Sequence, residues 1–142
     1  MAKYGTGDGK TAAARGIGLH LKLSLAREGK GGRKEFFGPG VQELLGRIRD
    51  TGSIQQAARG MGLSYVKALK ILRQTEEGVG RAVLVRRKGG NDRGRSELTP
   101  FGERFLGKYA AFCTEAEREL AGRFAAVMAE VLEGDEDGAP VP

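Results

Sequence analysis

The side chains of this chain that could do chemistry are mostly lysines and arginines. The sequence has 24 of them against 18 acidic residues, with one histidine, one cysteine and a formal net charge of +6. Cys113 has no second cysteine for an internal disulfide, and His20 leaves almost no residues for a metal site or a Cys–His nucleophile. No pair of carboxylates, lysines or tyrosines is spaced for general acid–base catalysis. We therefore expect a protein that is not an enzyme and that uses no metal or cofactor.

The basic residues gather in one short segment. The sequence RRKGGNDRGR, residues 86–95, contains five bases and one acid. A basic loop is often only solvated, but residues 1–132 as a whole hold 24 bases against 14 acids, a net charge of +10. Such an excess favours a polyanionic partner such as nucleic acid. The bases in this segment are Arg86, Arg87, Lys88, Arg93 and Arg95.

Two short helices are predicted before this segment. Pro39 suits the first turn of a helix that Gly52 ends, and the apolar residues between them recur at three- and four-residue spacings. Ser53 and Gln56 then fit a capping box, which predicts a second helix from about Ile54 to Gly60. The apolar residues of the first helix are Val41, Leu44, Leu45 and Ile48.

A third helix, with one apolar and one cationic side, is predicted over residues 64–77. Gly60 and Gly62 allow a sharp turn before it, and Ser64 is its cap. Two helices joined by so short a turn are typical of a helix-turn-helix, whose second helix enters the DNA major groove. The residues expected near bases or phosphates on this helix are Ser64, Tyr65, Lys67, Lys70 and Gln74. At the start of the second helix, Ser53 and Gln55 are expected to touch phosphate.

Residues 82–98 predict a β-hairpin with the basic segment at its tip. Residues 82–85 form a β-prone run and residues 96–98 offer a return strand. A strand, a basic tip and a second strand directly after a helix-turn-helix are typical of the wing of a winged-helix domain. We therefore assign Arg86, Arg87, Lys88, Arg93 and Arg95 to the DNA backbone or the neighbouring minor groove.

The N-terminal part is expected to contain one strand. Aliphatic residues alternate from Ile17, which predicts a strand over residues 17–28 with His20 on its solvated face. The glycine-rich GKGGRKEFFGPG that follows is expected to be a loop. Residues 1–16 are expected to form a flexible arm; their GTGDGKT resembles a phosphate loop but has Tyr4 where the first glycine belongs.

A long helix is predicted from Pro100 to residue 133, with Thr99 as its cap. At 1.5 Å per residue it would be about 50 Å long, more than a small domain can cover, so its apolar stripe predicts a homodimer. Cys113 lies beside Phe112 on this helix, and we interpret it as a buried apolar residue; the acidic tail 134–142 is expected to be disordered. The residues assigned to the dimer interface are Phe105, Tyr109, Phe112, Leu120 and Phe124.

The order GSIQQAARGMGLSY, then GG and RSELTPFGERFL, resembles the N-terminal DNA-binding domain of the molybdate-responsive, ModE-type regulators, which belong with the LysR-type winged helices. The opening LHLKLSLA is also similar to that family's first strand, so the resemblance covers about Leu19 to Phe124. It implies that the third helix lies in the major groove and that the wing contacts the backbone. The family's regulators carry a C-terminal molybdate-binding module, for which we expect no room after the long helix, so oxyanion sensing is not carried over and any small-molecule effector stays open.

Together these patterns predict a mainly α fold with a small β wing (α+β), a winged helix-turn-helix over residues 17–99 and a dimerisation helix over residues 100–133. We expect a bacterial-type, cytoplasmic transcriptional regulator that binds a two-fold DNA operator as a homodimer. No apolar run reaches the roughly 18 to 20 residues of a membrane span, so no membrane contact is expected. Two alternatives remain: a winged helix that binds protein instead of DNA, and an enzyme with a pocket of paired carboxylates.

Overall fold

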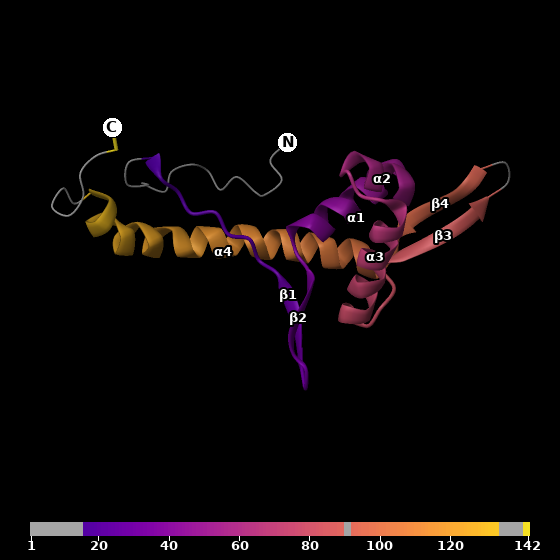
Figure 1. Cartoon of the computed structure of the whole chain (residues 1–142), viewed down its shortest axis with the longest axis horizontal. Helices are drawn as coiled ribbons and strands as arrows, with labels where there is room; N and C mark the ends of the chain where they lie inside the picture. The colour runs from indigo at the N-terminus through magenta and orange to yellow at the C-terminus, as the bar shows by residue number, and fades with distance from the viewer. Residues whose placement is uncertain (1–15, 90–91, 134–140) are drawn as a thin grey trace. The chain divides into compact units, whose positions relative to one another are not determined.

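The computed structural model describes residues 16–89, 92–133 and 141–142, and the side chains of residues 88–93 lie outside this description. Within the described residues the chain is α+β, with four helices and two two-stranded antiparallel sheets (Figure 1). The mainly helical α+β class and the long last helix are thus confirmed. The strands are β1 (Leu25–Gly29), β2 (Gly32–Phe37), β3 (Leu84–Gly89) and β4 (Asp92–Leu98). The helices are α1 (Pro39–Thr51), α2 (Ile54–Gly60), α3 (Tyr65–Val79) and α4 (Pro100–Glu133).

The chain forms two compact units, and α4 contributes residues to both. One unit is Lys22–Tyr109, which holds the two sheets, α1 to α3 and the start of α4. Of the described residues, the second unit joins residues 16–21 with residues 110–133. The first turns of α4 belong to the first unit, where Leu106 and Tyr109 are buried.

The core of the first unit lies between α1, α2 and α3. Leu44, Leu45 and Ile48 of α1 have no exposed surface, which explains the three- and four-residue spacing of their apolar side chains. Small residues on the other two helices allow close approach, since Ala57 and Ala68 are at most 1% exposed. Full burial of each leucine or isoleucine contributes roughly 1.5–3 kcal/mol.

The ends of these helices follow the predicted caps. The Ser53 hydroxyl accepts a hydrogen bond from Gln56 N, and the Ser64 hydroxyl accepts one from Lys67 N, each at 3.1 Å. Gly52 ends α1 with a φ of 71°, in the left-handed region that side chains disfavour. The predicted starts of α2 and α3 and the end of α1 are therefore confirmed.

The N-terminal strand is shorter than the sequence predicts. Residues 17–28 were predicted as one strand, but β1 begins only at Leu25, and residues 17–24 have no strand assignment. A strand needs a hydrogen-bonded partner, and in this segment β2 pairs only with the residues from Leu25 to Gly29. Residues 17–24 have no such partner strand. β2 lies in the segment that was expected to be a loop. The expectation was wrong because the glycines and charged residues of this segment do not show the alternating pattern of a strand, although the strand ends in Phe36 and Phe37.

The β3–β4 hairpin is fixed to the start of α4 through Thr99. The Thr99 amide donates to Val83 O at 2.9 Å, and the Thr99 hydroxyl donates to Ala82 O at 2.8 Å and accepts from Gly102 N at 2.9 Å. A Cβ at Gly102 would meet the Val83 carbonyl oxygen, so this position requires glycine. Thr99 and Gly102, in the sequence LTPFG, thus connect the hairpin to α4.

Aromatic residues at the start of α4 pack within their own chain. The Phe37 ring of β2 meets Phe105 and Tyr109 edge-on, with centroids 4.9 and 4.8 Å apart. The Tyr109 hydroxyl also donates to Leu23 O at 2.6 Å. Phe105 and Tyr109 therefore pack against β2 within one chain, and their assignment to a dimer interface stays a prediction.

The second unit contains a short extended segment against a helix. Glu117 Oε1 accepts from the Leu21 amide at 2.9 Å and lies 3.3 Å from His20 Nδ1, so His20 is not simply solvated as expected. Ala121 is buried, whereas Phe112 and Val127 are 61% and 65% exposed. Among the described residues, no helix has the length and apolar character needed to cross a membrane.

Candidate nucleic-acid interface

The exposed face of α3 carries most of the predicted contact residues. Ala68, Leu72 and Thr75 are buried on the inner side of this helix. Lys67 and Lys70 are exposed on its outer side, as predicted from the sequence, while Gln74 is half-buried. Ser64 is also exposed, at the cap that orients the first turn.

Two further residues on this face were missed by the sequence analysis. Val66 is 76% exposed, and Arg73 is also exposed. Their spacing could have revealed them, because Val66, Lys70 and Arg73 stand four and three residues apart and so share one face of a helix.

A hydrogen bond connects the start of α3 to the β3–β4 hairpin. Arg86 Nη2 donates to the Tyr65 hydroxyl at 3.1 Å, and Tyr65 is 42% exposed. The register pairs Arg86 with Ser96, which is only 7% exposed, so both lie on the inner face of the hairpin. Tyr65 and Arg86, 21 positions apart in the sequence, therefore form one continuous polar surface.

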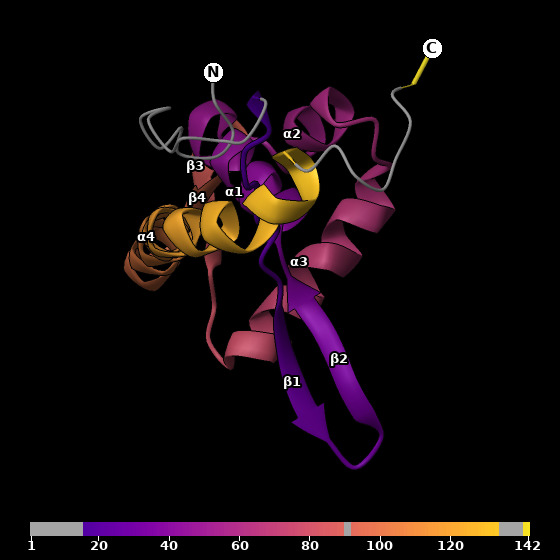
Figure 2. The ribbon, with the colours of Figure 1, turned by 90° about the vertical axis from the view of Figure 1, so that its left-hand side faces the viewer.

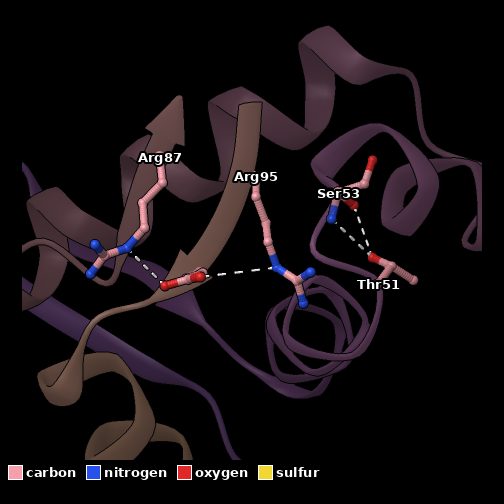
Figure 3. A network of polar contacts seen from close by, with 5 residues as sticks. Thr51, Ser53, Arg87 and Arg95 are labelled. Atoms are coloured by element: carbon pink, nitrogen blue, oxygen red, sulfur yellow. Dashed lines mark hydrogen bonds and ion pairs between the residues drawn. The ribbon is translucent and has the colours of Figure 1, made fainter. Parts of the chain in front are cut away.

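The opposite face of the hairpin carries a charge network (Figure 3). Arg87 Nε lies 2.9 Å from Glu97 Oε2, and Arg95 Nε lies 3.9 Å from Glu97 Oε1. All three side chains are at least 43% exposed. Glu97 thus neutralises part of the positive charge that the sequence analysis assigned to the DNA backbone. The Lys88 and Arg93 side chains lie outside the described residues.

Arg95 also lies beside the start of α2 (Figure 3). Its side chain covers Gly52, where a Cβ would stand 3.1 Å from Arg95 Nε, and the Ser96 amide donates to Gly52 O at 2.9 Å. Ser53 follows directly, and its amide donates to the Thr51 hydroxyl at 3.2 Å. The fold therefore brings Ser53, which was assigned to phosphate, next to a guanidinium from a distant part of the chain. Gln55, the other predicted contact of α2, is exposed.

The described residues hold no group of three or more His, Cys, Asp or Glu side chains placed to bind a metal ion. Where side chains are described, every buried side-chain nitrogen and oxygen has a hydrogen-bond partner. The chemistry available at the α3 face and the β3–β4 hairpin is therefore that of exposed hydrogen-bond donors and cations.

No protein-family model matches this chain, and no curated protein sequence matches it.

Proposed function

We propose that this chain is a winged helix-turn-helix protein that binds double-stranded DNA sequence-specifically and regulates transcription. The observation that carries the proposal is the Arg86–Tyr65 hydrogen bond, which joins the exposed α3 face to a cationic hairpin. A helix of about 10–12 Å diameter fits the major groove of about 12 Å width. In this arrangement α2 and α3 are the helix-turn-helix and the β3–β4 hairpin is the wing.

Base contacts come from the α3 face. Lys67 and Lys70 bond guanine O6 or N7, and Arg73 can reach the same atoms or a phosphate. Val66 is 76% exposed and packs against a thymine methyl group, which would cover this apolar side chain in the complex. Tyr65 orients Arg86, and its hydroxyl hydrogen stays free to bond a base edge or a phosphate. Ser64 and Gln74 border this face.

Backbone contacts come from the wing and from the start of α2. Arg86, Arg87 and Arg95 are exposed cations that can each hold a phosphate. Ser53 and Gln55 add neutral donors beside them. Because phosphate contacts carry no sequence information directly, this set fixes the register in which α3 meets the bases. Lys88 and Arg93 belong to the same proposed set by their place in the sequence.

A homodimer completes the proposal. In the second unit, Phe112, Leu120, Val127 and Val131 are all exposed, and a helix places them along one side. Glu119 and Arg123 border this side four residues apart. Two antiparallel helices place the same edge of each chain face to face, so an antiparallel copy centred between these two residues would set each Glu119 against the other chain's Arg123. We therefore propose an antiparallel pair, with Phe124 at its edge, that binds a two-fold operator.

The exposed apolar side of α4 also favours a second candidate, a winged helix that docks another protein. That function would give weak DNA binding with no sequence preference and a partner of different sequence on α4. The resemblance to the ModE-type regulators supports the DNA-binding proposal.

Sequencing of genomic DNA fragments captured by the purified protein tests the proposal. We expect enrichment of a two-fold site with half-sites about 34 Å apart, or a multiple of that distance. Binding to this site should be stronger than to shuffled DNA of the same length and should weaken steeply with salt. Capture without any enriched sequence would contradict the proposal.

A further inference from the structure

We propose that the β1–β2 hairpin is a second backbone contact, in which Lys30 and Lys34 bind phosphates that flank the DNA segment read by α3. This inference rests on the DNA-binding function proposed above. The hairpin was expected to be a loop, and it has no part in the proposed wing. Every residue from Arg27 to Glu35 is exposed.

The two faces of the hairpin differ in charge. The strand register pairs Arg27 with Lys34, and the next pair is Glu28 with Arg33. Because side chains alternate between faces, Arg27 and Lys34 share a face without an acid, and Glu35 lies on the other face with Glu28. Glu28 Oε1 lies 3.2 Å from Arg33 Nη2. The turn adds Lys30, so the uncompensated cations are on one face and at the tip.

The hairpin is anchored to the C-terminal end of α3 (Figure 2). Arg27 Nε donates to Gly78 O at 2.7 Å, and the Phe36 ring covers Gly78 so closely that a Cβ there would collide with it. The wing is bonded to the opposite end of the same helix, through Tyr65 and Arg86. A cationic hairpin therefore stands at each end of α3.

The spacing of the two hairpins suits one DNA duplex. α3 has 15 residues, which corresponds to about 22 Å at 1.5 Å per residue, or roughly two-thirds of a duplex turn. Arg27, the strand partner of Lys34, is bonded to Gly78 at the end of α3, and Lys30 stands three residues further along the hairpin, about 10 Å or on the order of three base pairs. Lys34 would therefore meet a phosphate at the border of the segment that α3 covers, and Lys30 would meet one outside it.

The test compares the double variant K30Q/K34Q with the wild type on two duplexes. One duplex contains the half-site alone, and the other adds flanking DNA of arbitrary sequence. Arg27 is left unchanged because it holds the hairpin to α3. The matched control is R104Q/K108Q, which removes two exposed cations from α4 in the same compact unit. Circular dichroism melting should show the same midpoint for all three proteins.

On the flanked duplex we expect K30Q/K34Q to bind about tenfold more weakly at low salt. The slope of log affinity against log salt concentration should be smaller in magnitude by about 1.8, which corresponds to the loss of two phosphate contacts. On the half-site alone the variant should match the wild type, and the control should match it on both duplexes. Equal binding of K30Q/K34Q and wild type on the flanked duplex would overturn the proposal. An equal loss on both duplexes would also overturn it, since the lysines would then act within the half-site. A wild type that binds no DNA would instead refute the proposed function, and this inference with it.

Discussion

Arg86 of β3 donates a hydrogen bond to the Tyr65 hydroxyl at the start of α3, at 3.1 Å. This contact links the hairpin to the helix, and both residues are exposed. In the proposed complex it holds one guanidinium at the border between the groove and the backbone.

Tyr65→Phe removes this hydrogen bond and keeps the ring. We expect DNA binding to weaken several-fold, since Arg86 loses the acceptor that positions it, while the melting temperature stays nearly constant because the bond is exposed. Fluorescence anisotropy with the captured site measures the first effect, and calorimetry measures the second. Unchanged affinity would show that the contact has no role in binding.

Lys67 and Arg93 should differ in what they determine. Lys67→Gln should change which bases are preferred, whereas Arg93→Gln should weaken binding to all sequences and reduce the salt slope by about one. Binding of both variants to a library of single-base site variants separates the effects. An equal loss on specific and random DNA for both variants would remove the assignment of Lys67 to bases.

Val66→Ala should relax a preference for thymine at one position of each half-site. The valine is 76% exposed, so its truncation costs little stability, and the lost contact with a thymine methyl is the expected effect. The control is the same site with uracil in place of that thymine, on which wild type and variant should bind alike. A variant that keeps the wild-type thymine preference would contradict this role.

Glu97→Gln should strengthen DNA binding. The carboxylate lies 2.9 Å from Arg87 and 3.9 Å from Arg95, so it competes with phosphate for the same cations. Its removal should raise affinity for specific and random DNA alike and steepen the salt dependence. Glu103→Gln on α4 removes one exposed acid away from the hairpin and serves as the control. Weaker binding by the Glu97 variant would mean that the acid orients the arginines productively.

Gly102→Ala and Gly107→Ala should change stability in opposite directions. A Cβ at Gly102 meets the Val83 carbonyl oxygen, whereas a Cβ at Gly107 on the same helix meets nothing within 4 Å. We expect the first variant to lose about 1–3 kcal/mol of unfolding free energy and the second to gain up to about 1 kcal/mol. Urea unfolding measures both. Equal effects would show that the joint at Thr99 adapts freely.

Val127→Glu should weaken the proposed dimer, because it buries a charge in the apolar side of α4. Ala111→Glu, at an exposed position outside that side, is the control and should leave self-association unchanged. Sedimentation equilibrium compares the three proteins. A wild type that stays monomeric at high concentration would refute the dimer directly.

Local signals in the sequence were sufficient for α1, α2 and α3. The periodic apolar residues, the serine caps at Ser53 and Ser64 and the left-handed Gly52 act over a few residues, so their effect does not depend on the rest of the fold. The same holds for the hairpin strands before Thr99. The cationic character of the surface was also evident, because composition determines net charge.

Pairing between distant segments could not be read in this way. The sequence did not reveal β2, because its partner strand and the aromatic residues it covers are set by register and not by local propensity. The apolar pattern of α4 could not distinguish the buried Tyr109 from Phe112, which is 61% exposed, because both residues belong to the same helical stripe. The sequence also could not show that Glu97 holds Arg87, or that a basic hairpin stands at each end of α3.

Neighbouring residues and composition are therefore enough to predict which helices form, where they are capped and that the chain carries excess positive charge. Which cations stay uncompensated and which apolar residues stay uncovered follows from the folded arrangement. Both depend on contacts between residues far apart in the chain, such as Arg86 with Tyr65 and Phe37 with Tyr109.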